Sequence, residues 1–326
     1  MNWIFRRKAK SEPATNFDIG YASDPGRKRG GEPNQDAVSI EHPAEGQNIP
    51  PLLIVADGMG GHAGGAEASR LVIDAIHGHY RVTTEISDAS KFLTECLDKA
   101  LLALRDAAAQ KPELTGMGSA IVLALLYPKK VVVANVGDCR AYLLHGKKMT
   151  QLSLDHSVVA DQVRAGLLTP LQAIHHPKRN QLTQSLNSRR DTVKPFVKES
   201  RFNREDAIVL CTDGLWSLIS EAVIQAVVSE MAPQQAAEKF VALTYARQSP
   251  DNISVIVVKR SVNKLHAQQP LVEKGSCDAV LVNLILSVIP DGAACLRSAL
   301  RSLKPDGRAV VFDKFLPERN PESCAN

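Results

Sequence analysis

Residues 52–61 read LLIVADGMGG, an uninterrupted apolar run that ends in an aspartate and a glycine-rich turn. A compact apolar run bounded by turn residues predicts a buried strand over residues 52–56 that enters a glycine-rich loop. Residues 207–214, AIVLCTDG, repeat the same pattern. Two buried strands are therefore each expected to deliver an aspartate at the carboxyl end.

The segments around these two runs alternate between helical and extended patterns. Apolar residues at helical spacing predict helices over about residues 65–80, 88–109, 219–230 and 233–247. Runs of β-forming residues predict antiparallel strands over residues 119–127, 130–136, 140–144 and 253–258. Residues 155–190 are more polar and predict a small helical excursion.

The length and composition are those of an ordinary globular protein. The chain has 326 residues, of which 44% are apolar and 23% charged, which excludes a chain disordered throughout, a collagenous repeat and a disulfide miniprotein. This length fits two domains, or one large domain with an appendage. We expect the following segments: a basic lead at 1–15, a main domain at 16–260, a linker at 261–272, a smaller piece at 273–316 and a tail at 317–326.

The excess of positive charge is confined to the start of the chain. Thirty-nine Lys and Arg against thirty-five Asp and Glu give a net charge of +4. The first ten residues supply this excess through Arg6, Arg7, Lys8 and Lys10. Elsewhere the sequence shows no basic stripe interleaved with aromatic residues, so we expect no nucleic-acid partner.

Cysteine spacing and hydropathy predict a cytoplasmic protein without an integral membrane segment. The longest apolar stretch, residues 279–289, contains Asn283 and is too short to span a bilayer. No C-x-x-C spacing occurs, which favours reduced thiols over a disulfide or zinc framework. The cysteines are Cys96, Cys139, Cys211, Cys277, Cys295 and Cys324.

Four aspartates lie where an apolar run meets a turn: Asp57, Asp138, Asp213 and Asp251. Taken singly, each has an ordinary explanation, because aspartate is common in turns beside strands. If their strands end at one sheet edge, however, the acids converge, and clustered carboxylates repel each other unless a cation neutralises them. Oxygen ligands without a cysteine or histidine indicate magnesium or manganese and not zinc.

A set of short motifs resembles the bacterial type 2C, metal-dependent protein serine/threonine phosphatases in order and spacing, over about residues 16–260. The motifs are Asn34-Gln35-Asp36, Asp57-Gly58-Met59-Gly60-Gly61-His62, Gly116-Met117-Gly118-Ser119, Asn135-Val136-Gly137-Asp138-Cys139-Arg140, Asp155-His156-Ser157, Cys211-Thr212-Asp213-Gly214-Leu215-Trp216 and Asp251-Asn252-Ile253-Ser254. The resemblance implies an α+β fold, an αββα sandwich of two antiparallel sheets flanked by helices. It also implies a binuclear metal centre at the sheet edge.

The resemblance further implies a role for each acid. Asp57 would bridge two Mn²⁺ or Mg²⁺ ions, the Gly58 carbonyl would help to hold one, and Asp213 with Asp251 would hold the other. Asp36 would act through bound water, and Asp138 together with Asp213 would hold a third, weaker cation. A water shared by the two metals would attack the phosphorus of phosphoserine or phosphothreonine in proteins. The chain would thereby oppose a bacterial-type serine/threonine kinase.

The chain departs from the family pattern at the phosphate-binding arginine and at the leaving-group acid. The arginine of the family lies three residues before Asn34, where this chain has Gly31. Arg29 is our candidate for the bidentate phosphate contact, with Arg27 and Lys28 as alternatives. Some family members have a histidine in place of Met59, proposed as the general acid. Here His62 is interpreted as a loop-orienting residue.

Residues 277–315 resemble the later strand–helix–strand portion of a class I S-adenosylmethionine-dependent methyltransferase. They comprise an apolar run at 278–289, a helix-like segment at 293–303, a turn at 304–307 and a strand at 308–312. The glycine-rich loop that would hold the cofactor is absent, because everything upstream belongs to the phosphatase-like region. We therefore expect a small α/β fragment that does not transfer methyl groups by itself.

Two further functions compete with phosphatase activity. One is a catalytically silent module that recognises phosphoproteins through the same cleft. The other is a bifunctional phosphatase and methyltransferase, which the missing cofactor loop disfavours. Pseudoenzymes commonly lose metal carboxylates, whereas Asp57, Asp213 and Asp251 are all present. The sequence therefore favours an active enzyme.

Overall fold

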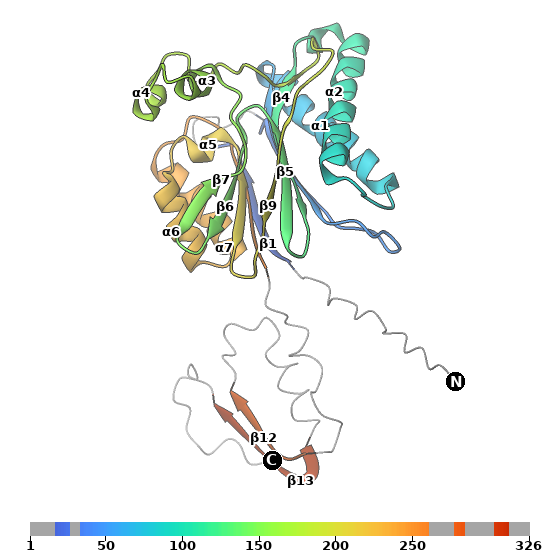
Figure 1. Ribbon diagram of the computed structural model, residues 1–326, viewed down its shortest axis with the longest axis vertical. Coiled ribbons are helices and arrows are strands. Elements are labelled where there is room, and N and C mark those ends of the chain that lie inside the picture. The colour runs from blue at the N-terminus through green and yellow to red at the C-terminus, as the bar shows by residue number, and fades with distance from the viewer. Residues whose placement is uncertain (1–16, 27–32, 261–276, 284–302, 313–326) are drawn as a thin grey trace, which may run out of the picture. The chain divides into compact units, whose positions relative to one another are not determined.

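The computed structural model describes residues 17–26, 33–260, 277–283 and 303–312 (Figure 1). The chain divides into two compact units, Met1–Arg260 and Ser261–Asn326. No helix in the described ranges is long and apolar enough to cross a membrane.

Two antiparallel sheets form the centre of the first unit. One has the strand order β2-β3-β4-β5-β9, with the short strand β8 (Leu186–Asn187) paired to β4, and the other has the order β1-β11-β10-β6-β7. The strands of the first sheet are β2 (Asp36–Glu41), β3 (Leu52–Met59), β4 (Gly118–Leu126), β5 (Lys130–Val136) and β9 (Phe196–Arg201). Those of the second are β1 (Phe17–Asp24), β11 (Ile253–Arg260), β10 (Ala207–Cys211), β6 (Arg140–His145) and β7 (Lys148–Gln151).

Helices cover the outer face of each sheet, which gives the layer order helix, sheet, sheet, helix (Figure 1). The first sheet carries α1 (Gly61–Val82) and α2 (Ala89–Gln110), and η1 (Pro112–Leu114) follows α2. The second carries α5 (Asp213–Trp216), α6 (Glu221–Glu230) and α7 (Pro233–Ala246). The α+β sandwich expected from the sequence is thus confirmed.

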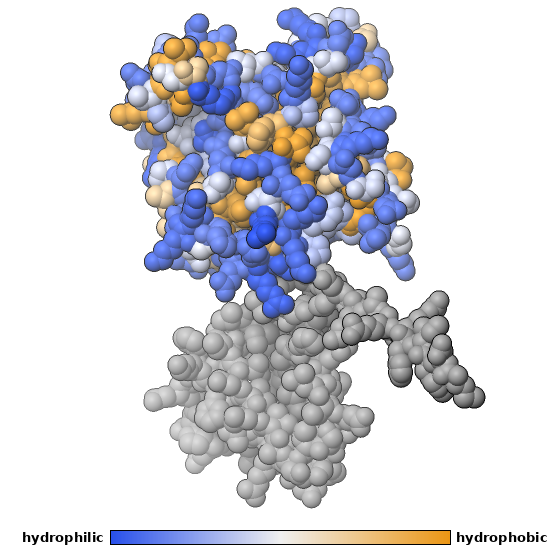
Figure 2. Space-filling model, in the orientation of Figure 1, coloured by the Kyte–Doolittle hydropathy of each residue, from blue (hydrophilic) through white to orange (hydrophobic). Residues whose placement is uncertain are grey.

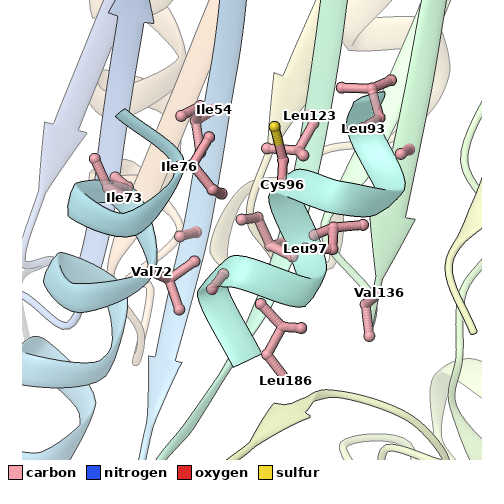
Figure 3. Close-up of a cluster of buried hydrophobic side chains, with 14 of the residues drawn as sticks. Ile54, Val72, Ile73, Ile76, Leu93, Cys96, Leu97, Leu123, Val136 and Leu186 are labelled. Carbon is pink, nitrogen blue, oxygen red and sulfur yellow. The ribbon is translucent and has the colours of Figure 1, made fainter. Parts of the chain in front are cut away.

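Strand β3 is buried on both faces, which explains its unbroken apolar sequence. Leu52, Ile54 and Ala56 pack in the cluster under α1 and α2, together with Val72, Leu97 and Leu123 (Figure 3). Their neighbours Leu53 and Val55 point the opposite way, into the cluster between the two sheets. Because successive side chains of a strand face opposite sides, a strand with two covered faces needs apolar residues at every position.

The glycine-rich turn after β3 is shorter than the sequence predicts. We expected the strand to stop at residue 56 and the helix to begin near residue 65. The ladder with β4 instead continues through the pairs Asp57↔Ala120, Gly58↔Ser119 and Met59↔Gly118. Only Gly60, at φ 139°, then separates the strand from α1, which begins at Gly61. Asp57 is therefore a strand residue, held in register by hydrogen bonding on both sides.

The predicted helical excursion at 155–190 contains α3 (Val158–Arg164) and α4 (Pro170–Ile174). These helices lie at the end of the sandwich where α5 lies (Figure 1). Apolar side chains gather on the surface over them (Figure 2), and the exposed ones include Leu167, Leu171 and Ile174. The segment is anchored by a backbone hydrogen bond of 3.0 Å from His156 N–H to the Gly137 carbonyl.

In the second unit, β12 (Cys277–Asn283) and β13 (Leu303–Phe312) pair in parallel. Parallel pairing is what a strand–helix–strand unit requires. The helix expected at 293–303 lies outside the described residues except for its last position, which opens β13. The turn expected at 304–307 was wrong: these residues lie within β13. The pairing shifts there from Cys277↔Leu303 to Ala279↔Arg308, and the irregularity takes up the extra residues.

The packing of α7 on β1 gives a direct test of the fold. A Cβ atom at Gly20 would lie 2.1 Å from the backbone nitrogen of Gln234, at the start of α7. We expect Gly20→Ala to lower the free energy of unfolding by about 1–3 kcal/mol, measured by denaturant titration. Gly78→Ala is the matched control, because Gly78 is in α1 with no atom within 4 Å of its added Cβ. This control should gain about 0.5–1 kcal/mol, and equal effects of the two changes would contradict the packing.

Candidate metal centre

Two of the aspartates face each other across neighbouring strands. Asp36 opens β2, Asp57 lies near the end of β3, and the two residues are directly paired in the antiparallel ladder. Like charges at directly opposite positions of a ladder destabilise the sheet. Asp36 is also 8% exposed, so water screens its charge poorly. This pair therefore requires a compensating positive charge.

The other acids come from turns that reach the same place. Asp138 lies in the turn between β5 and β6, Asp213 is the first residue of α5, and Asp251 precedes β11. Burial raises the pKa of Asp57 well above its ordinary value, and the charges of Asp36, Asp213, Asp138 and Asp251 raise it further. The structure thus brings together all the acids that the sequence singles out.

Burial and mutual repulsion act on the remaining acids as well. Burial raises the pKa of Asp213 well above its ordinary value, and Asp138 and Asp251 add to the effect. The pKa of Asp138 rises to about 6, again first through burial and then through the charge of Asp155. A cluster in which several carboxylates resist ionisation is stable in the charged form only when cations are present.

A hydroxyl joins the two sheets behind the acids. Thr212 donates through its Oγ1 to Asp36 Oδ2 at 2.8 Å and accepts from the backbone N–H of Ser254 at 3.1 Å. The amide side chain of Asn252 makes a second link, because its Oδ1 accepts from the backbone N–H of Gln35 at 2.9 Å. These contacts fix β2 against β10 and β11. Thr212 and Asn252 belong to two of the short motifs, but no local pattern indicates these contacts.

Glycine is required beside two of the acids. A Cβ at Gly58 would lie 1.9 Å from the carbonyl oxygen of Gly65, and one at Gly214 would lie 1.9 Å from that of Asn252. Real Cβ atoms do not approach a carbonyl oxygen so closely, so any larger residue would push the backbone away. The Asp-Gly pairs at 57–58 and 213–214 therefore bring the backbone close to its neighbours as well as supplying the carboxylate.

The donors fit a hard divalent cation that keeps much of its water shell. The cluster consists of carboxylates, which are among the oxygen ligands that Mg²⁺ and Mn²⁺ prefer. In the described part of the chain, no three Asp, Glu, His or Cys side chains form a ready-made cage. Mg²⁺ is usually bound through one or two carboxylates with several waters, so such a cage is not needed. Cys139 is buried beside the acids, and burial raises the pKa of its thiol well above the ordinary value.

A buried histidine beside the turn that carries Asp138 has a structural role. His156 is buried, and its Nδ1 accepts a hydrogen bond from the backbone N–H of Gly137 at 3.2 Å. Burial, with the charge of Arg164, lowers the pKa of His156, so the ring is neutral at pH 7. A neutral ring is what the accepting nitrogen needs. Arg29, Arg27 and Lys28, the candidates for the phosphate contact, lie outside the described residues.

Comparison with known proteins identifies two family models that match the chain. The protein phosphatase 2C model matches residues 25–248, more than half of the chain. A methyltransferase domain model matches residues 222–311. The structure places the first part of this second match in α6, α7 and β11 of the phosphatase-like fold. Less than half of the chain is covered by the methyltransferase model.

Curated relatives and solved structures agree with the first model. The chain is 32% identical over 248 residues to the serine/threonine phosphatase Stp of Listeria innocua, covering 74% of this chain and 95% of that protein. The structure of Stp1 from Staphylococcus aureus matches with a TM-score of 0.70 and 29% identity over 78% of this chain and 100% of that one. The PstP catalytic domain, solved with two manganese ions, matches with a TM-score of 0.65 and 28% identity, covering 74% of this chain and 97% of that one. The chain belongs to the protein phosphatase 2C family and is a serine/threonine protein phosphatase of the bacterial type.

Proposed function

We propose that this chain hydrolyses phosphoserine and phosphothreonine in proteins at a centre of two Mn²⁺ or Mg²⁺ ions organised by Asp57. The pairing of Asp36 with Asp57 at the middle of a buried acidic cluster is the observation that carries the proposal. When bound, the cations supply an acidified water as nucleophile and offset charge on the phosphoryl oxygens.

The proposed ligand set is the one that the family resemblance implies, and the position of each acid supports it. Asp57 is influenced by all four other carboxylates, which suits a residue that would hold both cations. The Gly58 carbonyl would hold one cation, and Asp213 with Asp251 would hold the other. Asp36 would act through bound water. Asp138, whose charge acts on Asp213, would share a third and weaker cation with it.

The other residues of the site keep the carboxylates in place. The Thr212 hydroxyl holds Asp36, and the backbone N–H of Gly58 donates to the Gln35 carbonyl at 3.0 Å. Neutral His156 holds the turn that carries Asp138. Such fixed contacts limit the reorganisation needed when charge develops on the phosphoryl group.

Substrate recognition would combine the cations with a guanidinium. We assign the bidentate phosphate contact to Arg29, because a planar fork of N–H donors matches phosphate oxygens. The partners would be phosphorylated proteins, the products of a bacterial-type serine/threonine kinase. The named relatives Stp and PstP are serine/threonine phosphatases, which supports this class of substrate.

Release of phosphate from a phosphothreonine peptide tests the activity and its metal requirement. We expect release with Mn²⁺, none after chelation, and a loss of at least about hundredfold in kcat/KM for Asp213→Ala, since even outer-shell partners of a metal cost 10–100-fold. Asp106→Ala removes an exposed carboxylate on α2 and serves as the control. If the folded protein released no phosphate with any divalent cation, the result would favour a catalytically silent phosphoprotein-binding module.

Substitution of the basic residues at 27–29 tests the phosphate contact. Arg29→Ala should lower kcat/KM on the phosphopeptide about 10–100-fold, because it removes a charge-assisted pair of hydrogen bonds. Arg29→Lys should recover little, since an ammonium group cannot form the fork. Arg27→Ala and Lys28→Ala are matched controls in the same segment. A larger loss in either control would transfer the assignment to that residue.

Thermal unfolding of the metal-free protein should depend on pH. Asp138 has a folded pKa of about 6, raised from an ordinary value of 3.8. Protonated Asp138 therefore contributes to the stability of the folded protein. This contribution is fully present below pH 3.8 and is lost as pH rises through about 6. In chelator, the melting temperature should fall between about pH 4 and 6, and Asp138→Asn should flatten this fall. Saturating Mn²⁺ should reverse the trend, because metal binding displaces protons. Equal slopes in wild type and Asp138→Asn would contradict the assignment.

A further inference from the structure

One residue from each of three motifs, Arg140, Asp155 and Trp216, meets at the guanidinium of Arg140, and none of the three belongs to the proposed ligand set. Its Nε donates to both carboxylate oxygens of Asp155, at 3.1 and 3.0 Å, and its Nη2 donates to Asp155 Oδ2 at 2.6 Å. Its Cζ lies 3.6 Å from the ring centroid of Trp216. The Nη1 group donates to the Tyr142 hydroxyl at 2.9 Å. The side chain of Arg140 is 19% exposed, so this arrangement is largely withdrawn from water.

The carboxylate behind Arg140 is itself held in place. Asp155 is buried, its Oδ1 accepts from Gln151 Nε2 at 2.8 Å, and its backbone carbonyl accepts from Arg164 Nη1 at 3.0 Å. Asp155 therefore offers a fixed surface against which the Arg140 fork is oriented. A buried ion pair of this kind adds little net stability, because desolvation offsets the attraction. The fixed orientation of the Arg140 guanidinium, and not a contribution to stability, is therefore the property that bears on function.

In front of Arg140, Trp216 connects two of the acids. The indole Nε1–H donates to the backbone carbonyl of Asp138 at 3.0 Å. Trp216 is also the last residue of α5, the short helix that Asp213 opens. One side chain thus ties the turn that carries Asp138 to the helix that carries Asp213. The guanidinium stacked on the ring restrains the orientation of the indole, and with it the direction of this hydrogen bond.

We propose that Arg140, held by Asp155 and stacked on Trp216, is a positioning residue that sets the placement of Asp138 relative to Asp213. It thereby controls the affinity of the weaker cation site that these two acids share. The inference rests on the proposed metal centre but concerns residues outside the proposed ligand set. The two cations proposed at Asp57 would depend instead on Asp36 and on the ladder of β2 and β3, whereas Arg140 lies in β6 of the other sheet.

Calorimetric titration of the metal-free full chain with Mn²⁺ separates the two classes of site. Trp216→Phe keeps an aromatic ring for the guanidinium but removes the indole N–H together with part of the ring, so it should weaken the weaker class about fivefold. Arg140→Gln should weaken it more than about tenfold, because it removes a charged fork. The tight class should keep its affinity in both variants. Arg70→Gln is the matched control, since Arg70 also donates to carboxylates but lies exposed on α1.

Fluorescence adds a readout that a purely structural role would not change. The sequence holds two tryptophans, so Trp3→Phe leaves Trp216 as the single one. The emission of Trp216 should change over the range of Mn²⁺ concentrations that fills the weaker class of site. Arg140→Lys in this background should shift that range to higher concentrations. If Trp216→Phe leaves the Mn²⁺ affinity of the weaker class of site unchanged, the proposal is overturned, even where Arg140→Gln does not fold. Absence of all Mn²⁺ binding by wild type would overturn the metal centre as well.

Discussion

The repulsion between Asp36 and Asp57 is the constraint on which the site depends. The antiparallel ladder of β2 and β3 sets these carboxylates opposite each other, and turns after β5 and β10 and before β11 add three more acids. Hydrophobic burial on both faces of β3 supplies the favourable free energy that holds the arrangement together. In the proposed metal centre, cations would turn this unfavourable cluster of charges into a binding site for phosphate oxygens.

The surrounding contacts make the acidic cluster rigid, and they do not relieve the repulsion among its carboxylates. Thr212 and Asn252 connect the two sheets. Close backbone approaches at Gly58 and Gly214 restrain the backbone next to Asp57 and Asp213. Such repulsion lowers the stability of the metal-free protein, but the same carboxylates are needed for function when metal is bound. This conflict between stability and function is common at active sites. The contacts of Arg140 with Asp155 and Trp216 extend this principle to the turn that carries Asp138.

Local sequence patterns predicted the long helices, the aspartates and the strands β3, β4, β5, β6, β10 and β11, because burial and turn chemistry leave signals within a few residues. Ordered motifs predicted the family. The Thr212–Asp36 bond joins residues 176 positions apart, and no local pattern marks it. The contacts among Arg140, Asp155 and Trp216 were missed for the same reason, although each residue was quoted within a motif. The extension of β3 through Met59 was missed because Asp and Gly are poor strand formers that the β4 ladder holds in place.

Diffraction data at the manganese absorption edge test the cation requirement most directly. Crystals of the full chain grown with Mn²⁺ should give two anomalous peaks beside the Asp57 carboxylate, with Asp213 and Asp251 adjacent to one of them. Crystals of Asp57→Asn grown in the same way should lose both peaks while keeping the strand pairing of β2 and β3. The absence of any anomalous peak beside Asp57 in the unaltered chain at saturating Mn²⁺ would contradict a cation-stabilised acidic cluster.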